Sequence, residues 1–144
     1  MKRIHINKGF TLIELLLVLA IIGVLTTFLM ANFIGAKARA RDAERKSDLR
    51  QIQSAFELYR SDQGSYPPAA LFICGGSLTN GGTTYMQKIP CDPLNSGSNV
   101  YTYTPAGTPP TSYTLSACLE NTNDSQKDAT NTCSSGVSYT VTNP

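Results

Sequence analysis

The stretch Leu15–Ala36, LLLVLAIIGVLTTFLMANFIGA, decides the fold of this chain, because it runs for 22 residues without a charged side chain. As an α-helix it would be about 33 Å long, close to the thickness of the hydrocarbon core of a bilayer. A secretory signal would have a shorter apolar region followed by a cleavage site of small residues. Here more helix-forming sequence follows at once, so we expect a retained helix over residues 10–36 that can cross a membrane.

The next segment, residues 37–63, predicts that the helix continues into water as an amphipathic helix. Residues 37–60 contain no Gly or Pro and are rich in helix formers. Four apolar residues recur at helical spacing: Leu49, Ile52, Phe56 and Tyr59. They form a single stripe, which predicts that this half of the helix covers a sheet. Gly64 and the Pro67-Pro68 pair then end the helix.

The part of this segment before residue 51 is charged nearly all round. Acids are interleaved with the bases, and Asp42 and Lys46 have the favourable i, i+4 order. This mixture favours a solvated helix face over a surface that binds a partner or nucleic acid.

Residues 64–144 change in character and predict a small globular region. Residues 69–99 are rich in Gly, Ser and Asn and predict a flexible connection. Three β-prone runs follow, at residues 99–104, 112–119 and 136–142. The residues that share one face of the last two runs are Tyr113, Leu115, Ala117 and Leu119, and Val137, Tyr139 and Val141. The chain therefore predicts an α+β fold, in which a long N-terminal helix packs on a small antiparallel sheet.

The 144 residues divide by charge into a basic leader and a nearly neutral remainder. Residues 1–9 carry a charge of +3, and without them the chain would have nine bases and ten acids. The total of +2 is too balanced to make nucleic acid the first expectation for the whole chain.

The four cysteines, Cys74, Cys91, Cys118 and Cys133, all lie in the second half of the chain. An even number in a loop-rich region indicates two disulfides and an oxidising compartment. A zinc site would need ligand pairs at short spacing, which these cysteines do not have. Of the three connectivities, we expect Cys74 with Cys91 and Cys118 with Cys133, because each bond closes a turn-rich segment with few apolar residues.

The residues Lys8-Gly9-Phe10-Thr11-Leu12-Ile13-Glu14, followed by the apolar run, resemble the class III signal of type IV pilins and of the pseudopilins of type II secretion. The resemblance is strong over residues 8–68 and loose over residues 89–119. It implies that a prepilin peptidase removes residues 1–9 by cutting between Gly9 and Phe10, and then methylates the new Phe10 amine. It also implies that Glu14 directs assembly by pairing with the Phe10 amine of a neighbouring copy.

The resemblance further implies a type IV pilin-like fold and a structural function. The chain would be stored in the cytoplasmic membrane, cleaved, and added by the pilus assembly machinery to a homo-oligomeric filament on the cell surface. No cofactor is expected. An enzyme is not expected, because the chain from Phe10 onward has no histidine, and no nucleophile with its base or facing carboxylate pair can be assembled from it. Whether the filament would serve twitching motility, adhesion, DNA uptake or secretion is left open.

Two other functions stay as alternatives. The first is the major pseudopilin of a type II secretion system, which the resemblance implies would carry a calcium loop and lack cysteine pairs. The acidic residues that could supply such a loop are Glu120, Asp124 and Asp128. The second is a membrane-anchored binding module, such as a DNA-uptake or adhesive filament subunit, with tyrosines as stacking surfaces. We expect the tyrosines to serve in sheet packing instead.

Overall fold

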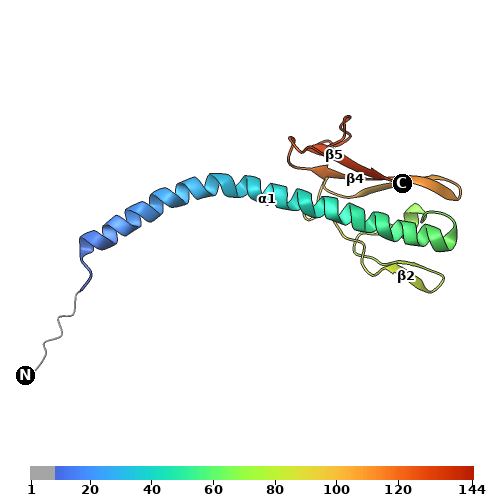
Figure 1. Cartoon of the computed structure of the whole chain (residues 1–144), viewed down its shortest axis with the longest axis horizontal. Helices are drawn as coiled ribbons and strands as arrows, with labels where there is room; N and C mark the ends of the chain where they lie inside the picture. Colours follow the sequence, from blue (N-terminus) through green and yellow to red (C-terminus); the bar gives the residue numbers. More distant parts are fainter. Residues whose placement is uncertain (1–8) are drawn as a thin grey trace, which may run out of the picture. The chain divides into compact units, whose positions relative to one another are not determined.

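The computed structural model describes residues 9–144, and for residues 28–32 it describes the backbone without the side chains. One long helix, α1, runs from Leu12 to Gln63 (Figure 1). It ends where the sequence predicts, because the next residue, Gly64, has a φ of 73° and donates its N–H to the Arg60 carbonyl at 2.8 Å. By its contacts the chain divides into two compact units, Met1–Lys37 and Ala38–Pro144.

In the second unit, the C-terminal half of α1 packs on an antiparallel sheet with the strand order β3-β4-β5. The strands are β3 (Thr102–Gly107), β4 (Pro110–Leu119) and β5 (Val137–Thr142). At the centre of the sheet, Leu115 lies opposite Tyr103 on one side and Val141 on the other. Figure 1 shows β4 and β5 alongside this half of the helix. The predicted α+β fold is confirmed.

The core forms between the predicted helical stripe and the predicted face of β4. Leu49, Ile52, Phe56 and Tyr59 are at most 4% exposed. The β4 residues Tyr113, Leu115, Ala117 and Leu119 are at most 2% exposed. The ring of Phe56 meets that of Tyr113 edge to face at 5.3 Å between centroids. Both patterns were readable because a buried face repeats every 3.6 residues on a helix and every second residue on a strand.

Two features of residues 69–110 differ from the prediction. Within the predicted flexible connection, a two-stranded hairpin forms from β1 (Leu78–Asn80) and β2 (Thr83–Met86), after a short 3₁₀ helix at Ala69–Leu71. These strands, of three and four residues, are too short to show a period. In addition, β3 continues past residue 104, where the predicted run ends, and includes Pro105. Because β3 is an edge strand, a proline there is tolerated.

The described part of the first unit is the N-terminal half of α1, whose apolar side chains are exposed. No helix in the described part of the chain has an apolar stretch long enough to cross a membrane. The predicted membrane-spanning run includes residues 28–32, whose side chains lie outside the described ones. The assignment of residues 10–36 to a membrane stays a prediction.

Candidate assembly site and charged surface

The start of α1 brings two residues of the predicted signal together. The Thr11 Oγ accepts a hydrogen bond from the Glu14 backbone N–H at 3.3 Å. In return, Glu14 Oε2 accepts the backbone N–H and the hydroxyl of Thr11, both at 2.8 Å. This reciprocal arrangement is a capping box, which satisfies free N–H groups at a helix start. The sequence analysis missed it, although Thr-x-x-Glu before an apolar run is its usual signature.

The predicted cleavage residues Gly9 and Phe10 lie just before this capping box. Both are exposed, and Phe10 is 79% exposed. A Cβ placed on Gly9 would meet no atom within 4 Å, so packing within the described chain does not require glycine at this position. Residues 1–8 of the predicted leader lie outside the described residues.

After the capping box, large apolar side chains are exposed around the whole circumference of the helix. Their exposed fractions range from 44% at Val18 to 82% at Leu12. The residues are Leu12, Ile13, Leu15, Leu16, Leu17, Val18, Leu19, Ile21, Ile22, Val24 and Leu25. An apolar surface of this extent is not stable in water and marks a site that lipid or other protein covers.

A buried ion-pair network lies farther along α1, around the fully buried side chain of Arg45. Its guanidinium donates to both carboxylate oxygens of Asp92, at 2.7 and 3.1 Å. It also donates to Asp42 at 2.7 Å and to Glu120 at 2.9 Å. Burial opposes the charge of Arg45, but these carboxylates outweigh it and raise the pKa of Arg45 above its usual value. Arg45 therefore ties the helix to the loop after Cys91 and to the end of β4.

Asp42 and Arg41 complete this network. Asp42 accepts the backbone N–H groups of Glu120 and Asn121, at 2.9 and 2.8 Å. Arg41 donates through two nitrogens to the carboxylate of Glu120. The hydrogen bond from Arg41, supported by that from Arg45, lowers the pKa of Glu120 from 4.5 to about 2 despite partial burial. The loop after β4 is held to the helix by these charges.

The structure corrects the expected solvated helix face in this part of the charge run. Asp42 and Arg45 are at most 2% exposed. The expected pair between Asp42 and Lys46 is absent from the described ion pairs, since Lys46 binds Asp124 at 2.8 Å instead. The sequence could not reveal these partners, because Asp92, Glu120 and Asp124 lie 47 to 78 residues away along the chain.

The three calcium candidates are not brought together. Glu120 is bound by arginines and Asp124 by Lys46, while Asp128 accepts the Thr140 hydroxyl at 2.7 Å. No group of three or more metal-binding side chains is found among the residues that the structure describes. The carboxylates that suggested a calcium loop serve as anchors for the chain between β4 and β5.

The two disulfides have the predicted pairing. Cys74 is bonded to Cys91 with 5.1 Å between their Cα atoms, and Cys118 to Cys133 with 5.8 Å. The first closes the segment that carries the β1-β2 hairpin, and the second closes the loop between β4 and β5.

The tyrosines of the globular region pack in its core, as expected from the sequence. Tyr66 and Tyr113 are at most 2% exposed and meet edge to face, with 4.7 Å between ring centroids. Tyr103 is half-buried and donates its hydroxyl to the Pro67 carbonyl at 2.7 Å. Tyrosines engaged in this way are not available to stack on bases.

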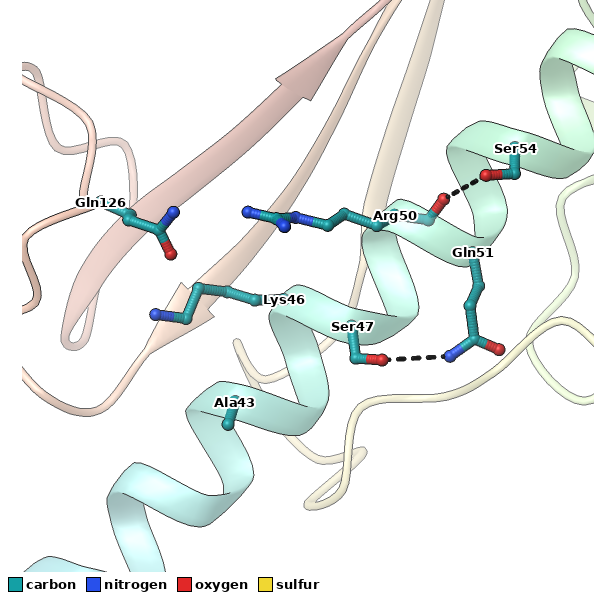
Figure 2. Close-up of a pocket in the computed structure, with 7 residues that line it drawn as sticks. All are labelled: Ala43, Lys46, Ser47, Arg50, Gln51, Ser54 and Gln126. Carbon is teal, nitrogen blue, oxygen red and sulfur yellow. Dashed lines mark hydrogen bonds between the residues drawn. The ribbon is translucent and has the colours of Figure 1, made fainter.

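An open groove lies on the outer face of α1 in the second unit (Figure 2). It has a volume of about 460 Å³ and is lined by Ala43, Lys46, Ser47, Arg50, Gln51, Ser54 and Gln126. In Figure 2 the side chains of Lys46 and Arg50 extend toward the side of the groove where Gln126 lies. The lining residues include two cations, Lys46 and Arg50, of which Lys46 is already paired with Asp124.

Two family models match the chain. The model described as "Type IV minor pilin ComP, DNA uptake sequence receptor" matches residues 32–136. The model described as "Prokaryotic N-terminal methylation motif" matches residues 4–30. The second match covers the predicted cleavage site and Glu14, and the first covers more than half of the chain.

Curated relatives include both pilins and secretion proteins. "Type II secretion system core protein G" of Vibrio cholerae is 33% identical over 46% of this chain and 46% of its own length. The protein of the same name from Dickeya chrysanthemi is 29% identical over 73% of this chain and 82% of its own. "Type IV major pilin protein PilA" of Myxococcus xanthus is 42% identical over 42% of this chain and 27% of its own.

The chain thus spans about half or less of the length of the Vibrio and Myxococcus relatives. No solved structure matches the chain. The capping box, the apolar helix and the helix-on-sheet domain agree with the match over residues 32–136 and with the methylation motif. The chain belongs to the type IV pilin family whose model is described as "Type IV minor pilin ComP, DNA uptake sequence receptor".

Proposed function

We propose that this chain is the structural subunit of a type IV pilus and polymerises through the N-terminal half of α1. The observation that carries the proposal is the set of large apolar side chains exposed around residues 12–25. These side chains need a cover, and a bilayer supplies it before assembly. In the filament, the same helices of other copies supply it by close packing. The fold within one copy leaves this half of the helix free for that use.

The finer steps of this function are part of the proposal. A membrane prepilin peptidase cuts between Gly9 and Phe10, and the new Phe10 amine is methylated. The exposed position of both residues ahead of the helix supports access by such an enzyme. The precursor resides in the cytoplasmic membrane, and the assembly machinery moves the mature chain into a filament at the cell surface. In this role the chain is a substrate and a building block, and it catalyses no reaction itself.

Intact-mass analysis and electron microscopy of fibres sheared from the source cells test the proposal. We expect fibres whose bulk protein begins at N-methylated Phe10 and carries two disulfides. Fibre protein that retains residues 1–9 would remove the peptidase step. A mature start beyond Ala36 would contradict the proposal as a whole, because the chain would then be an ordinary secreted domain.

The pseudopilin of a type II secretion system is the alternative favoured by the relatives that carry that name. It would form a short periplasmic filament instead of a surface fibre. The two disulfides favour the pilin. Deletion of the chain separates the two functions: loss of surface fibres with normal secretion supports a pilin, whereas loss of secretion supports a pseudopilin.

DNA uptake is a second candidate, favoured by the description of the matching family model. A DNA-binding assay on assembled filaments at several salt concentrations tests it. A steep fall in affinity with salt indicates contacts with phosphates. Filaments that bind no DNA at low salt would leave a structural or adhesive role.

A further inference from the structure

The bases that follow the apolar run of α1 fall into two groups. Arg41, Arg45 and Lys46 are each bound to a carboxylate of the second unit. Lys37 and Arg39 take part in none of the ion pairs among the described residues, and both are exposed. The fold therefore engages the bases that lie farther from the apolar run and leaves exposed the two that come directly after it.

No nearby acid on the helix is available to Lys37 or Arg39. Side chains that meet on a helix surface are three or four residues apart. Residues 15–41 contain no acid. Asp42 follows Arg39 at a spacing of three, but it is 2% exposed and is bound to Arg45. An anion that binds these two bases therefore comes from outside the described part of the chain.

The apolar surface of the first unit continues up to Lys37. Phe33 and Ile34, about one turn before it, are 71% and 77% exposed. Where such a helix crosses a bilayer, lysine and arginine side chains at its end keep their apolar stems in the apolar layer and place their charge among the headgroups. Lys37 and Arg39 are about 200° apart around the helix, so they present positive charge on both of its sides. This arrangement suits the phosphate groups of lipids that surround the helix.

We propose that Lys37 and Arg39 form a binding surface for anionic phospholipid headgroups, which holds the unassembled chain at the membrane boundary. The inference rests on the proposed function, because it requires a precursor that resides in a membrane. Each base near an anionic lipid surface strengthens the attraction about fivefold. A second copy at the same depth in the membrane cannot supply the anion, since it presents the same stretch of residues 15–41, without an acid.

Lipid selectivity in nanodiscs tests the proposal. The full chain is inserted into nanodiscs that contain equal amounts of phosphatidylglycerol, which is anionic, and phosphatidylcholine, which has no net charge. Native mass spectrometry of the released chain gives the ratio of the two lipids that stay bound. For the wild-type chain we expect phosphatidylglycerol to exceed phosphatidylcholine about fivefold or more. In the double variant Lys37→Gln with Arg39→Gln, the two lipids should bind about equally.

Arg50→Gln with Lys88→Gln is the matched control. Both side chains are exposed and take part in none of the described ion pairs, so the variant loses the same two charges. Arg50 lies about 16 Å beyond Arg39 along α1, which is more than the Debye length of about 8 Å at physiological ionic strength. Lys88 lies outside the helix, after β2. The lipid ratio of this variant should stay within about twofold of wild type.

A second double variant separates charge from the shape of the side chains. Lys37→Arg with Arg39→Lys keeps both charges and exchanges the two side chains, so it should keep the wild-type lipid ratio. A ratio that falls to that of the glutamine variant would overturn the inference, because binding would then depend on a specific packing of these residues instead of on their charge.

The other outcomes separate this inference from the proposed function. An inserted wild-type chain that binds the two lipids equally would overturn the inference alone, as would an equal loss of selectivity in the control variant. A wild-type lipid ratio in the glutamine variant, combined with weaker DNA binding by its filaments, would also overturn it and assign the two bases to nucleic acid. If the wild-type chain is not retained in nanodiscs at all, the proposed function fails together with the lipid-binding surface.

Discussion

At the residue scale, the most consequential side chain is Arg45, a charge that the fold removes from water. The free-energy cost of burying this charge is offset because Asp42, Asp92 and Glu120 all accept hydrogen bonds from the guanidinium. A buried ion pair adds little to the stability of the fold compared with a well-packed apolar group in the same place. Removal of one partner is nevertheless strongly destabilising, because the remaining charges stay buried without their counter-charge. Arg45 thereby ties the loop after Cys91 and the end of β4 to the helix.

We predict that Arg45→Ala lowers the free energy of unfolding by about 3–5 kcal/mol, since it leaves Asp42 and Asp92 buried without their cation. Thermal unfolding of the full chain in detergent micelles, followed by near-ultraviolet circular dichroism of the tyrosines, measures the loss. Arg39→Ala is the control, because Arg39 is exposed and outside the network; it should change stability by no more than about 0.5 kcal/mol. Equal effects of the two substitutions would contradict a structural role for the network.

Glu120 makes stability depend on pH. Because its pKa falls from 4.5 to about 2 on folding, its contribution is complete above the unfolded pKa and is lost as the pH falls toward 2. We expect Glu120→Gln to be less stable than wild type at neutral pH, with a difference in Tm that narrows between about pH 5 and pH 2. A difference that stays constant over this range would show that the Glu120 charge is not involved.

Whether the role of a single residue could be predicted depends on how far along the chain its interaction partners lie. Leu49 and Phe56 were assigned to the core because their spacing is a local property of the helix. The burial of Arg45 was not predicted, since its partners belong to loops distant in sequence and only the folded chain brings them together. The capping box of Thr11 and Glu14 was local and readable, but the pattern was interpreted only as part of a processing signal.

At the element scale, the turn that leads into β5 depends on Gly136. Its φ is 77°, and an added Cβ would lie 2.0 Å from the Leu119 carbonyl oxygen of the neighbouring strand. No side chain fits there unless β4 and β5 move apart at their first pair, Leu119 with Val137. The backbones of the two strands approach so closely that only glycine is accommodated.

We predict that Gly136→Ala destabilises the chain by more than about 3 kcal/mol, because it adds a backbone clash to the strain of the left-handed conformation. Gly97→Ala is the matched control: Gly97 has a φ of 60°, but nothing lies within 4 Å of its Cβ position. It should cost only about 1 kcal/mol from strain. The difference in Tm between the two variants isolates the clash, and equal values would mean that the strands are not so close.

The loop that precedes this turn is closed by Cys118 and Cys133, fifteen residues apart. We predict that Cys118→Ser with Cys133→Ser costs about 3 kcal/mol, the loop-closure value for a segment of this length. A non-reducing peptide map should recover Cys118 with Cys133 and Cys74 with Cys91. A peptide that links Cys91 to Cys118 would contradict this connectivity.

The pairing of the four cysteines could be predicted from the positions of the flexible segments. The β1-β2 hairpin could not. Asn80 at its tip donates to the Tyr59 hydroxyl and to Gln63 Oε1, both at 3.0 Å, so α1 holds the hairpin in place. A strand of three or four residues is too short to show a period in its sequence. Its structure comes from contacts with the helix, which single-sequence patterns do not contain.

At the scale of the whole molecule, the two units differ in whether their apolar side chains are buried within the chain. The second unit buries its apolar stripe inside one chain, whereas the described part of the first leaves its apolar side chains exposed. The 22 uncharged residues predicted that this part of the chain needs a partner or lipid to cover it, whereas the general function was expected from the resemblance of residues 8–14 to the class III signal. In the proposed filament, the axial register between neighbouring copies would depend on charged groups. Glu14 is the one charge in this apolar region and so the group through which a register can be set.

We predict that both Glu14→Ala and Glu14→Gln give an inserted, cleavable chain that enters fibres poorly. The capping box offers a competing explanation for this residue, since Glu14 accepts two hydrogen bonds from Thr11 and could serve only to start the helix. Glutamine also serves in capping boxes and keeps an acceptor oxygen, but it lacks the negative charge that a Phe10 amine would pair with. Alanine removes both properties, so the two variants separate the two roles. If charge pairing governs assembly, both should reduce fibre yield to a similar degree, while the residues from 38 onward retain their Tm and disulfides. Normal fibre yield from Glu14→Gln, in cells without a wild-type copy, would assign Glu14 to helix capping and contradict its role in setting the register.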